Sequence, residues 1–396
     1  MKPLLRICLI ILLSKGVLAQ APSGYNYDES KVPSFKLRSP LVTKDGREVM
    51  DRAAWDSQRQ ALLKEFEATV YGAVPQQADI KLSGVEVEES LVCNGKAVRA
   101  LTELTFTCEG RELRLDLLSY RPVGDGPFPI FLGMNFCGNQ TTIADPAVPL
   151  SRNWVMKNEE IGMPTNTATE ESRGGRSMRW PFELLVERGY AVCTLCYGDV
   201  DPDFDDGFEN GLHGLVQSKE FGAVAAWAWG LREVGGYLQQ LPWTDRVAVF
   251  GHSRLGKAAL WAGASDPRFT MVISNNSGCG GAALSKRQVG ETLKAINQRF
   301  PHWFVEAFHA YNERELELPL DQHLLMACVA PRLLYVTSAS EDLWADPKGE
   351  QLATEFARPA FELLGGRVGY HMRPGRHNML EFDWKRILDF ADANWR

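Results

Sequence analysis

The segment 247–260 constrains the fold of this chain more than any other stretch of its sequence. An apolar run ends at Gly251, Ser253 follows two residues later, and a series of small residues then favours a helix. This order predicts a nucleophile elbow, a tight strand-to-helix turn that lifts a reactive serine above a sheet. The usual pattern is G-x-S-x-G, whereas the second glycine here falls one position later, at Gly256. The alternative for this segment alone is a structural serine that caps a helix.

The other two members of a serine triad are found downstream in the required order. A hydrolase with this elbow needs an acid and then a histidine, each just past a later strand. The predicted strand 332–338 is followed by Glu341 and Asp342. The predicted strand 366–373 is followed by a turn that ends at His377, which alone among the seven histidines occupies the loop after the last predicted strand. We therefore predict that His377 is the general base and that one of these two carboxylates supports it.

Short apolar runs alternate with helical stretches over most of the chain, which predicts an α/β fold. Alternating segments over 97–106 and 111–120 predict an antiparallel hairpin at one edge of a sheet. The strand and helix units that follow predict an α/β-hydrolase, a three-layer sandwich with a mainly parallel central sheet. The polar stretch 138–178 is predicted to be a loop at the active-site rim. The other predicted elements are a helix over 52–71, strands over 127–133, 190–197, 246–251 and 269–275, and helices over 180–188, 221–238, 256–264 and 349–364.

The start of the chain predicts a signal peptide over residues 1–19. Lys2 and Arg6 precede a short apolar run, and a small-residue cleavage site ends at Ala19. Because the run is shorter than the about 20 residues that span a membrane, we expect a secreted or periplasmic protein without a stable anchor. Removal of the signal peptide takes away three cations and no acid, so the formal charge changes from −7 to −10. Nucleic acid is therefore a poor partner. We expect a monomer in which residues 20–396 form one catalytic domain with an N-terminal extension.

Seven of the eight cysteines remain after this cleavage, an odd number in a compartment that permits disulfides. Cys93 and Cys108 flank a predicted strand and are the pair that we favour for a disulfide. Cys193 and Cys196 form a CxxC motif inside an apolar run, which indicates a buried strand rather than a redox or metal site. The sequence has no HExxH motif and no paired CxxC motif, so we expect neither a metal nor a cofactor.

Further motifs accompany the elbow sequence GHSRLGK at 251–257. They are NFCGN at 135–139, RWP at 179–181, GDVDPD at 198–203, SNNSGCGG at 274–281, FPHWF at 300–304 and WADPKGE at 344–350. This set resembles the glucuronoyl esterases, carbohydrate esterase family 15, and the bacterial branch more than the fungal one. The resemblance extends over roughly residues 90–390. It implies cleavage of the ester between 4-O-methyl-glucuronic acid of xylan and lignin alcohols.

The resemblance also implies roles around the elbow. The nucleophile falls on Ser253 and the base on His377, and Arg254 is the arginine whose side chain helps to hold the oxyanion. Lys257 corresponds to the lysine that meets the uronate. Helical spacing supports Lys257 independently, because position i+4 from Ser253 lies on the same helix face and can reach over the pocket mouth. The alternative is a solvated helix lysine.

The triad acid departs from the fungal pattern. Fungal members carry a glutamate where this chain has Asn276, which cannot ionise. The bacterial arrangement instead implies Asp342, with Glu341 as its close competitor. The fungal disulfide beside the catalytic serine and histidine is also absent from the sequence, since His252 and Asn378 stand at its positions.

On the substrate side, Glu291 matches a glutamate that binds sugar hydroxyls, and Trp303 or, in bacterial members, Trp344 matches a tryptophan of the sugar pocket. We therefore predict a serine esterase that hydrolyses glucuronoyl esters joining glucuronoxylan to lignin alcohols. The alternatives are another carbohydrate esterase on the same fold, such as an acetyl esterase, and a catalytically inactive carbohydrate-binding relative. A cationic pocket favours a uronate over an acetyl group.

Overall fold

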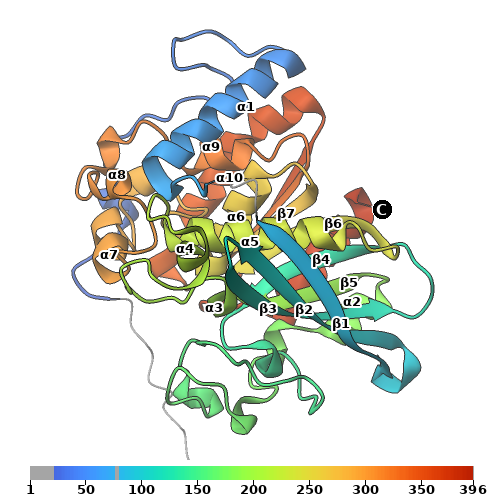
Figure 1. Cartoon of the computed structure of the whole chain (residues 1–396). Helices are drawn as coiled ribbons and strands as arrows, with labels where there is room; N and C mark the ends of the chain where they lie inside the picture. The colour runs from blue at the N-terminus through green and yellow to red at the C-terminus, as the bar shows by residue number, and fades with distance from the viewer. Residues whose placement is uncertain (1–21, 76–79, 396) are drawn as a thin grey trace, which may run out of the picture.

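The apolar runs that alternate with helices form the strands of one mixed sheet. Over residues 22–75 and 80–395, which the computed structural model describes, this sheet has nine strands in the order β1-β2-β3-β5-β4-β6-β7-β8-β9 (Figure 1). The strands are β1 (Lys81–Val92), β2 (Ala97–Cys108), β3 (Arg111–Pro122), β4 (Phe128–Asn135), β5 (Ala191–Cys196), β6 (Thr244–His252), β7 (Phe269–Asn275), β8 (Leu333–Ala339) and β9 (Arg367–Arg373). The first three pair antiparallel, and β4 to β9 pair in parallel. The predicted antiparallel hairpin of β2 and β3 and the mainly parallel sheet are confirmed, but β1, and not this hairpin, forms the edge of the sheet.

Helices cover both faces of the sheet because its central strands are apolar on both sides. They are α1 (Arg52–Phe66), α2 (Phe182–Glu187), α3 (Tyr197–Val200), α4 (Gly211–Val216), α5 (Ala223–Leu238), α6 (Arg254–Ser265), α7 (Leu293–Arg299), α8 (Glu306–His309), α9 (Gln322–Ala327), α10 (Pro347–Leu364) and α11 (Glu381–Asn394). In β6, Val247 and Val249 belong to a buried cluster shared with α5, α6 and α10, whereas Ala248 and Phe250 belong to a second cluster shared with α2 and α11. This is the predicted three-layer sandwich, with α1 packed outside α9 (Figure 1).

The long connection between β4 and α2 is irregular, as the sequence predicts, and makes up the green lobe at the bottom of Figure 1. It contains short 3-10 turns at Asn139–Thr141, Glu159–Ile161, Glu170–Ser172 and Ser177–Arg179. One of its ends contacts the end of β6, and the other contacts the loop after β9. Phe136 packs edge-on against the ring of His252, and Arg179 Nε donates to Asn378 Oδ1 at 2.7 Å. The connection therefore borders the elbow.

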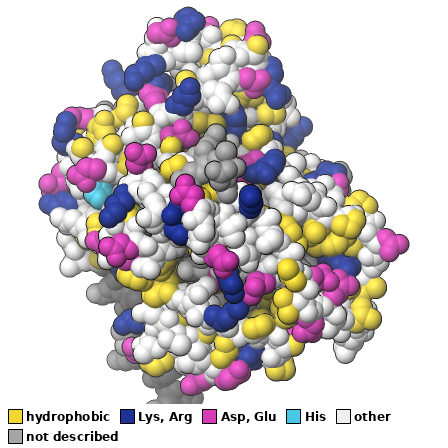
Figure 2. All heavy atoms as spheres, viewed as in Figure 1, with side chains coloured by type: hydrophobic (Ala, Val, Ile, Leu, Met, Phe, Trp, Pro, Cys, Tyr) yellow, Lys and Arg dark blue, Asp and Glu magenta, His cyan; other side chains and the backbone are white. Residues whose placement is uncertain are grey.

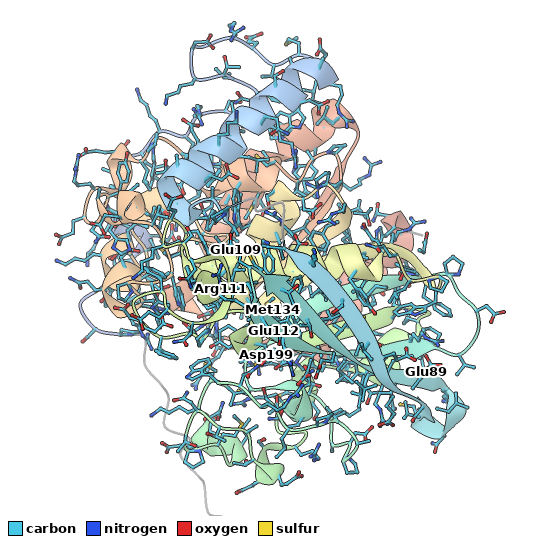
Figure 3. All side chains as sticks on the ribbon, viewed as in Figure 1. Glu89, Glu109, Arg111, Glu112, Met134 and Asp199 are labelled. Carbon is cyan, nitrogen blue, oxygen red and sulfur yellow. The ribbon has the colours of Figure 1, made fainter. Side chains whose placement is uncertain are left out.

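The predicted disulfide between Cys93 and Cys108 is wrong because the two residues lie at opposite ends of β2. This strand has 12 residues, and at about 3.3 Å per residue its ends are much farther apart than the about 7 Å that a disulfide tolerates between Cα atoms. In Figure 3, Glu89 of β1, which pairs with Ala100 near the start of β2, is labelled far from Glu109, which follows the end of β2. The CxxC motif, in contrast, lies in the fully buried β5, as expected for a buried strand.

The surface carries charges of both signs. On the face shown in Figure 2, cationic and anionic side chains are interspersed. Within residues 22–75 and 80–395, no helix is long and apolar enough to cross a membrane, and no group of three His, Cys, Asp or Glu residues is arranged to hold a metal ion. The predicted signal peptide lies outside these described residues.

Candidate active site

Ser253 occupies the turn between β6 and α6, with backbone φ of 59° and ψ of −130°. A positive φ is uncommon for a residue other than glycine and is typical of the strained turn of a nucleophile elbow. Gly251 permits this turn, because a Cβ there would lie 2.0 Å from the carbonyl oxygen of Leu255. A Cβ on Gly256 would lie 3.0 Å from the carbonyl oxygen of Gly251. Both glycines therefore serve the close crossing of strand and helix, including the one displaced by one position from the usual pattern.

Three side chains from separate loops meet at this turn. His377 Nε2 lies 2.9 Å from Ser253 Oγ, and His377 Nδ1 lies 2.6 Å from Asp342 Oδ2. Asp342 is buried at the end of β8. The neighbouring Glu341 is exposed, and its carboxylate faces Arg376 at 3.9 Å. Of the two acids that the sequence left in competition, Asp342 is therefore the one in contact with the imidazole.

Asn276 supports the acid from the end of β7. Its Nδ2 donates to Asp342 Oδ2 at 2.8 Å, the same oxygen that faces His377. The residue adopts a positive φ of 46°, and its backbone N–H donates to the Thr337 carbonyl at 2.8 Å. The amide of Asn276 thus acts as a hydrogen-bond donor to the carboxylate.

The loop that carries His377 is fixed by Arg373, the last residue of β9. Its guanidinium donates from Nη2 to the carbonyl oxygens of Arg376 at 2.9 Å and Asn378 at 2.7 Å, on either side of the histidine. Its Nε donates to the buried carboxylate of Asp383 at 2.9 Å. Buried charge-assisted hydrogen bonds of this kind hold a loop more firmly than neutral ones.

His252 packs directly against the ring of His377. The ring centroids of His252 and His377 lie 4.6 Å apart, and His252 Nδ1 lies 2.6 Å from Asn275 Oδ1. Burial and the neighbouring His377 hold the pKa of His252 well below its usual range. His252 is therefore neutral and places no competing charge beside the base.

Arg254, the first residue of α6, points its guanidinium across the site. Its Nη1 pairs with Asp203, and its Cζ lies 4.7 Å from the ring centroid of Trp303. Its Nε is buried and has no hydrogen-bond acceptor among the residues that the structure describes. Buried donors in native structures are almost always paired, so this unpaired N–H of the residue after Ser253 is unusual.

Asp203 anchors this cationic side of the site. Its Oδ2 accepts from the hydroxyl of Tyr197 at 2.9 Å as well as from Arg254. Its Oδ1 accepts from Trp303 Nε1 at 2.7 Å and lies 2.9 Å from His302 Nε2. Burial would raise the pKa of Asp203, but the hydrogen bond of His302 and the charge of Arg254 hold it at about 2. Asp203 is therefore an ionised counter-ion.

Lys257 is buried rather than extended over the mouth of the site, with 3 % of its surface exposed. Its Nζ donates to the carbonyl oxygens of Ser277 at 2.5 Å and Cys279 at 2.6 Å. Burial lowers its pKa, and the carboxylate of Glu291 opposes this shift. An ammonium has three N–H donors, so these two carbonyls leave one for a ligand.

The charge of Glu291 acts on this lysine, Trp344 contacts Glu291, and Lys257 Nζ lies 5.8 Å from the ring centroid of Trp303. Burial raises the pKa of Glu291, opposed by the charge of Lys257 and by a hydrogen bond from the Trp344 side chain. Trp344 is half-buried. Trp303 is only 3 % exposed and stacks on Phe300 at 3.8 Å, so its ring is not open to a ligand. Of the two tryptophans predicted from the resemblance, Trp344 has the accessible face.

Sequence reasoning missed the supporting roles of Asp203 and Arg373. Asp203 ends the GDVDPD motif, but its partner Arg254 is 51 residues away in the chain, and nothing local indicates that pairing. For Arg373, the signal available in the sequence was its position just before the loop that carries His377.

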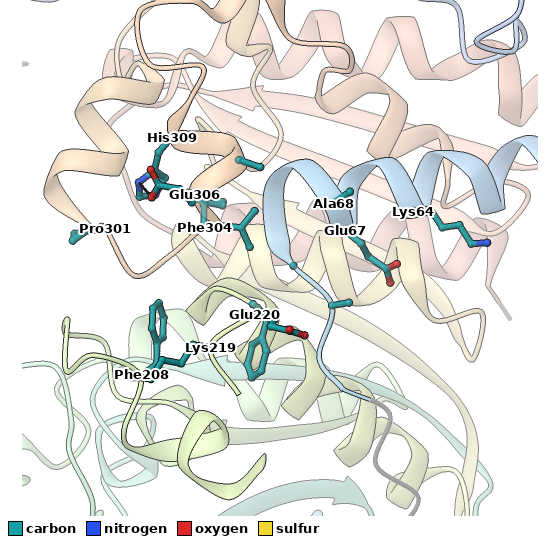
Figure 4. Close-up of a pocket in the computed structure, with 15 residues that line it drawn as sticks. Lys64, Glu67, Ala68, Phe208, Lys219, Glu220, Pro301, Phe304, Glu306 and His309 are labelled. Atoms are coloured by element: carbon teal, nitrogen blue, oxygen red, sulfur yellow. Dashed lines mark ion pairs between the residues drawn. The ribbon is translucent and has the colours of Figure 1, made fainter. Parts of the chain in front are cut away.

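A separate hollow of about 720 Å³ lies between the end of α1, the segment around Lys219 and α8 (Figure 4). Its lining mixes charged side chains with aromatic ones, among them Glu67, Phe208 and Phe304. None of the three residues of the hydrogen-bonded triad lines it. The reactive geometry therefore belongs to the elbow and not to this hollow.

Comparison with known proteins identifies the family. Residues 185–365 match the family model described as "Glucuronyl esterase, fungi". Over 98% of both chains the protein is 40% identical to Carbohydrate esterase MZ0003 from an unknown prokaryotic organism. It is 36% identical to 4-O-methyl-glucuronoyl methylesterase 1 of Phanerochaete chrysosporium, over 85% of this chain and 64% of that one.

Solved structures agree with this relationship. A promiscuous CE15 esterase from a marine bacterial metagenome superposes with a TM-score of 0.88 at 41% identity, over 93% of this chain and 99% of that chain. A glucuronoyl esterase from Solibacter usitatus superposes with a TM-score of 0.86 at 40% identity, over 93% of this chain and 100% of that chain. The resemblance drawn from the motifs is confirmed, and the chain belongs to the glucuronoyl esterases, carbohydrate esterase family 15.

Proposed function

We propose that this protein is a serine esterase that hydrolyses 4-O-methyl-glucuronoyl esters between glucuronoxylan and lignin alcohols. The observation that carries the proposal is the hydrogen-bonded series Ser253, His377 and Asp342 beside two cations, the half-buried Arg254 and the buried Lys257. The series supplies an activated nucleophile, and the cations suit the oxyanion and the carboxylate that ester hydrolysis of a uronate produces. No step of this reaction requires a cofactor.

In the first half-reaction Ser253 Oγ attacks the carbonyl carbon of the ester. His377 Nε2 takes the serine proton, and Asp342 stabilises the resulting imidazolium through Nδ1. The tetrahedral intermediate then collapses, the bond to the alcohol breaks, and His377 returns the proton to the departing oxygen. Water then attacks the acyl-enzyme, with His377 again as general base, and the uronate is released.

Two donors at the start of α6 are placed to hold the oxyanion. The backbone N–H of Arg254 belongs to the first turn of the helix, where N–H groups have no intrahelical acceptor. Its side-chain Nε is buried without an acceptor among the described residues. Both donors gain a partner when the carbonyl oxygen becomes negative, which lowers the barrier rather than merely tightening substrate binding.

The sugar is proposed to occupy the side of the site formed by Lys257, Glu291 and Trp344. The remaining N–H of Lys257 and the carboxylate of Glu291 can bind sugar hydroxyls, and the open face of Trp344 can stack on the ring. An acetyl ester has no group for these side chains. The cleavage after Ala19 and export from the cytoplasm remain part of the proposal.

Replacing the nucleophile and the base tests the mechanism. Ser253→Ala and His377→Ala are each expected to lower turnover of benzyl glucuronate by several orders of magnitude at an unchanged melting temperature, because triad members act as a unit. More than about a tenth of wild-type turnover in either variant would contradict the assignment. Labelling of the wild type by a serine-directed phosphonate, and its absence in Ser253→Ala, tests the inactive-relative alternative.

A broader esterase activity is the second candidate, because one similar structure is described as a promiscuous CE15 esterase. Turnover of benzyl glucuronate against an acetylated sugar ester separates the two readings. A kcat/KM at least tenfold higher for the glucuronate ester supports the proposed substrate class, and the reverse ranking supports an acetyl esterase.

A further inference from the structure

The N-terminal segment 22–31 lies against the sugar side of the site, although it is more than 200 residues from it in sequence. The carbonyl oxygen of Asn26 accepts from the backbone N–H of Gly290 at 2.8 Å, next to Glu291. The next backbone N–H, that of Glu291, donates to the carbonyl of Trp344 at 2.9 Å. Three chain segments are therefore joined side by side at this point.

The buried side chain of Arg287 joins the N-terminal segment to the loop of Trp344 a second time. Arg287 is 3 % exposed and donates from Nη2 to Glu29 at 2.5 Å and from Nε to Asp346 at 2.8 Å. Gly290 also packs so closely that a Cβ would lie 2.5 Å from the Trp344 carbonyl oxygen. The N-terminal segment is thus fixed to the two loops that carry Glu291 and Trp344.

Tyr25 is the side chain that this fixed segment presents at the site. Its ring meets the indole of Trp344 edge-on, with centroids 4.8 Å apart at 85°. The tyrosine is 38 % exposed. Trp344 is half-buried, and its side chain is hydrogen-bonded to Glu291. Two partly open aromatic rings at a right angle form a corner that can receive one flat face of a sugar ring.

From these contacts we infer that Tyr25 is a specificity-determining residue, which with Trp344 forms the wall for the uronate sugar. The inference rests on the proposed function, since it requires a glucuronate ester as substrate. Because Tyr25 contacts Trp344 and not the triad, its effect is on binding of the sugar and not on the chemical step. The effect is also independent of the alcohol, since the ester bond lies at Ser253 and the tyrosine lies on the sugar side.

Kinetics on matched esters test this role. Tyr25→Ala is expected to raise KM for methyl and benzyl glucuronate equally, by about threefold to tenfold, with kcat changed less than about twofold. Tyr25→Phe is expected to behave as wild type, because the ring and not the hydroxyl makes the contact. Hydrolysis of 4-nitrophenyl acetate is expected to be unchanged. Phe356→Ala is the matched control, since this exposed ring also meets one neighbour edge-on but lies on the outer side of α10.

Other outcomes overturn the inference. An unchanged KM for Tyr25→Ala, a rise confined to the benzyl ester, or an equal loss on the acetate would each remove Tyr25 from the sugar side. Calorimetric binding of methyl glucuronate to Ser253→Ala, with and without Tyr25→Ala, gives the same answer without turnover. If the wild type cleaves glucuronate esters and Tyr25→Ala has no effect, this inference alone fails. If the wild type neither binds nor cleaves them, the proposed function fails and the inference fails with it.

Discussion

Asn276 Nδ2 donates to the same oxygen of Asp342 that faces His377 Nδ1, so one carboxylate oxygen serves both neighbours. The amide cannot ionise, and it stabilises the charged form of the carboxylate by hydrogen bonding. The carboxylate at the end of β8 therefore contacts the imidazole, and the amide at the end of β7 contacts that carboxylate as a donor.

Asp342→Asn is expected to reduce kcat by about 10⁴-fold, because an amide favours the wrong tautomer of the imidazole and cannot stabilise its charge. Asn276→Asp is expected to cost far less at neutral pH. It places a second carboxylate beside the first, so the acid-side limb of the kcat profile is expected to move to higher pH. Glu341→Gln is the matched control, since that exposed side chain faces Arg376 instead. A larger loss in Glu341→Gln than in Asp342→Asn would relocate the acid.

Arg254→Lys tests the oxyanion role with the charge retained. A lysine can still pair with Asp203 but has no donor at the position of Nε. Turnover of glucuronate and acetate esters is expected to fall in parallel by about 10²-fold, because both reactions develop the same oxyanion. The melting temperature of the variant shows separately whether the ion pair with Asp203 still stabilises the fold. An unchanged kcat would show that the unpaired Nε has no part in the reaction.

Lys257→Met tests whether the buried ammonium binds the sugar. The charged hydrogen bond is worth about 1.5–3 kcal/mol, so KM for glucuronate esters is expected to rise about tenfold to a hundredfold with a smaller change in kcat. The melting temperature is also expected to fall, because the carbonyls of Ser277 and Cys279 lose their donor. Lys385→Met, an exposed lysine on α11, is the control. Equal losses on glucuronate and acetate esters would mean that Lys257 does not bind the sugar.

The parts of the site that sequence reasoning predicted are those set by local pattern and chain order. The elbow is a continuous segment, and the acid and base follow consecutive strands of a parallel sheet, whose carboxyl ends meet at one edge. Lys257 was predicted on the correct helix face, but its burial depends on carbonyls of a turn 20 residues later. Accessibility also decides between Trp303 and Trp344, and it depends on packing that neither motif contains.

The remaining errors have similar causes. β1 was not predicted as a separate strand. Apolar and polar residues alternate over 85–88, but little of the strand is buried on either face, and Val85 and Val87 are both exposed. The disulfide between Cys93 and Cys108 failed because flanking one strand places two residues far apart, whereas neighbours across a hairpin turn are close. The contact of Tyr25 with Trp344 joins segments too distant in sequence for any local pattern to indicate it.

Glu350, which is not a member of the triad, gives a pH dependence of stability. It is fully buried on α10, where its carboxyl group accepts from the backbone N–H of Gly278 at 2.9 Å and from the Ser338 hydroxyl at 2.5 Å. Burial raises the pKa of Glu350 to about 8, and the nearby Asp342 adds to the rise, while these hydrogen bonds oppose it. In the unfolded chain a glutamate has a pKa of about 4.3.

Between these two pKa values the folded protein holds a proton that the unfolded chain releases, so stability is expected to fall as pH rises from about 4.3 to 8. Glu350→Gln keeps the shape of the side chain and removes the titration. The melting temperature of the wild type, measured against that of Glu350→Gln, is therefore expected to decline steadily from pH 5 to pH 8. Glu355→Gln, an exposed glutamate on the same helix, is expected to follow the wild type at every pH. A difference in melting temperature between wild type and Glu350→Gln that stays constant over this range would contradict the prediction. It would show that Glu350 has the same pKa in the folded and unfolded states.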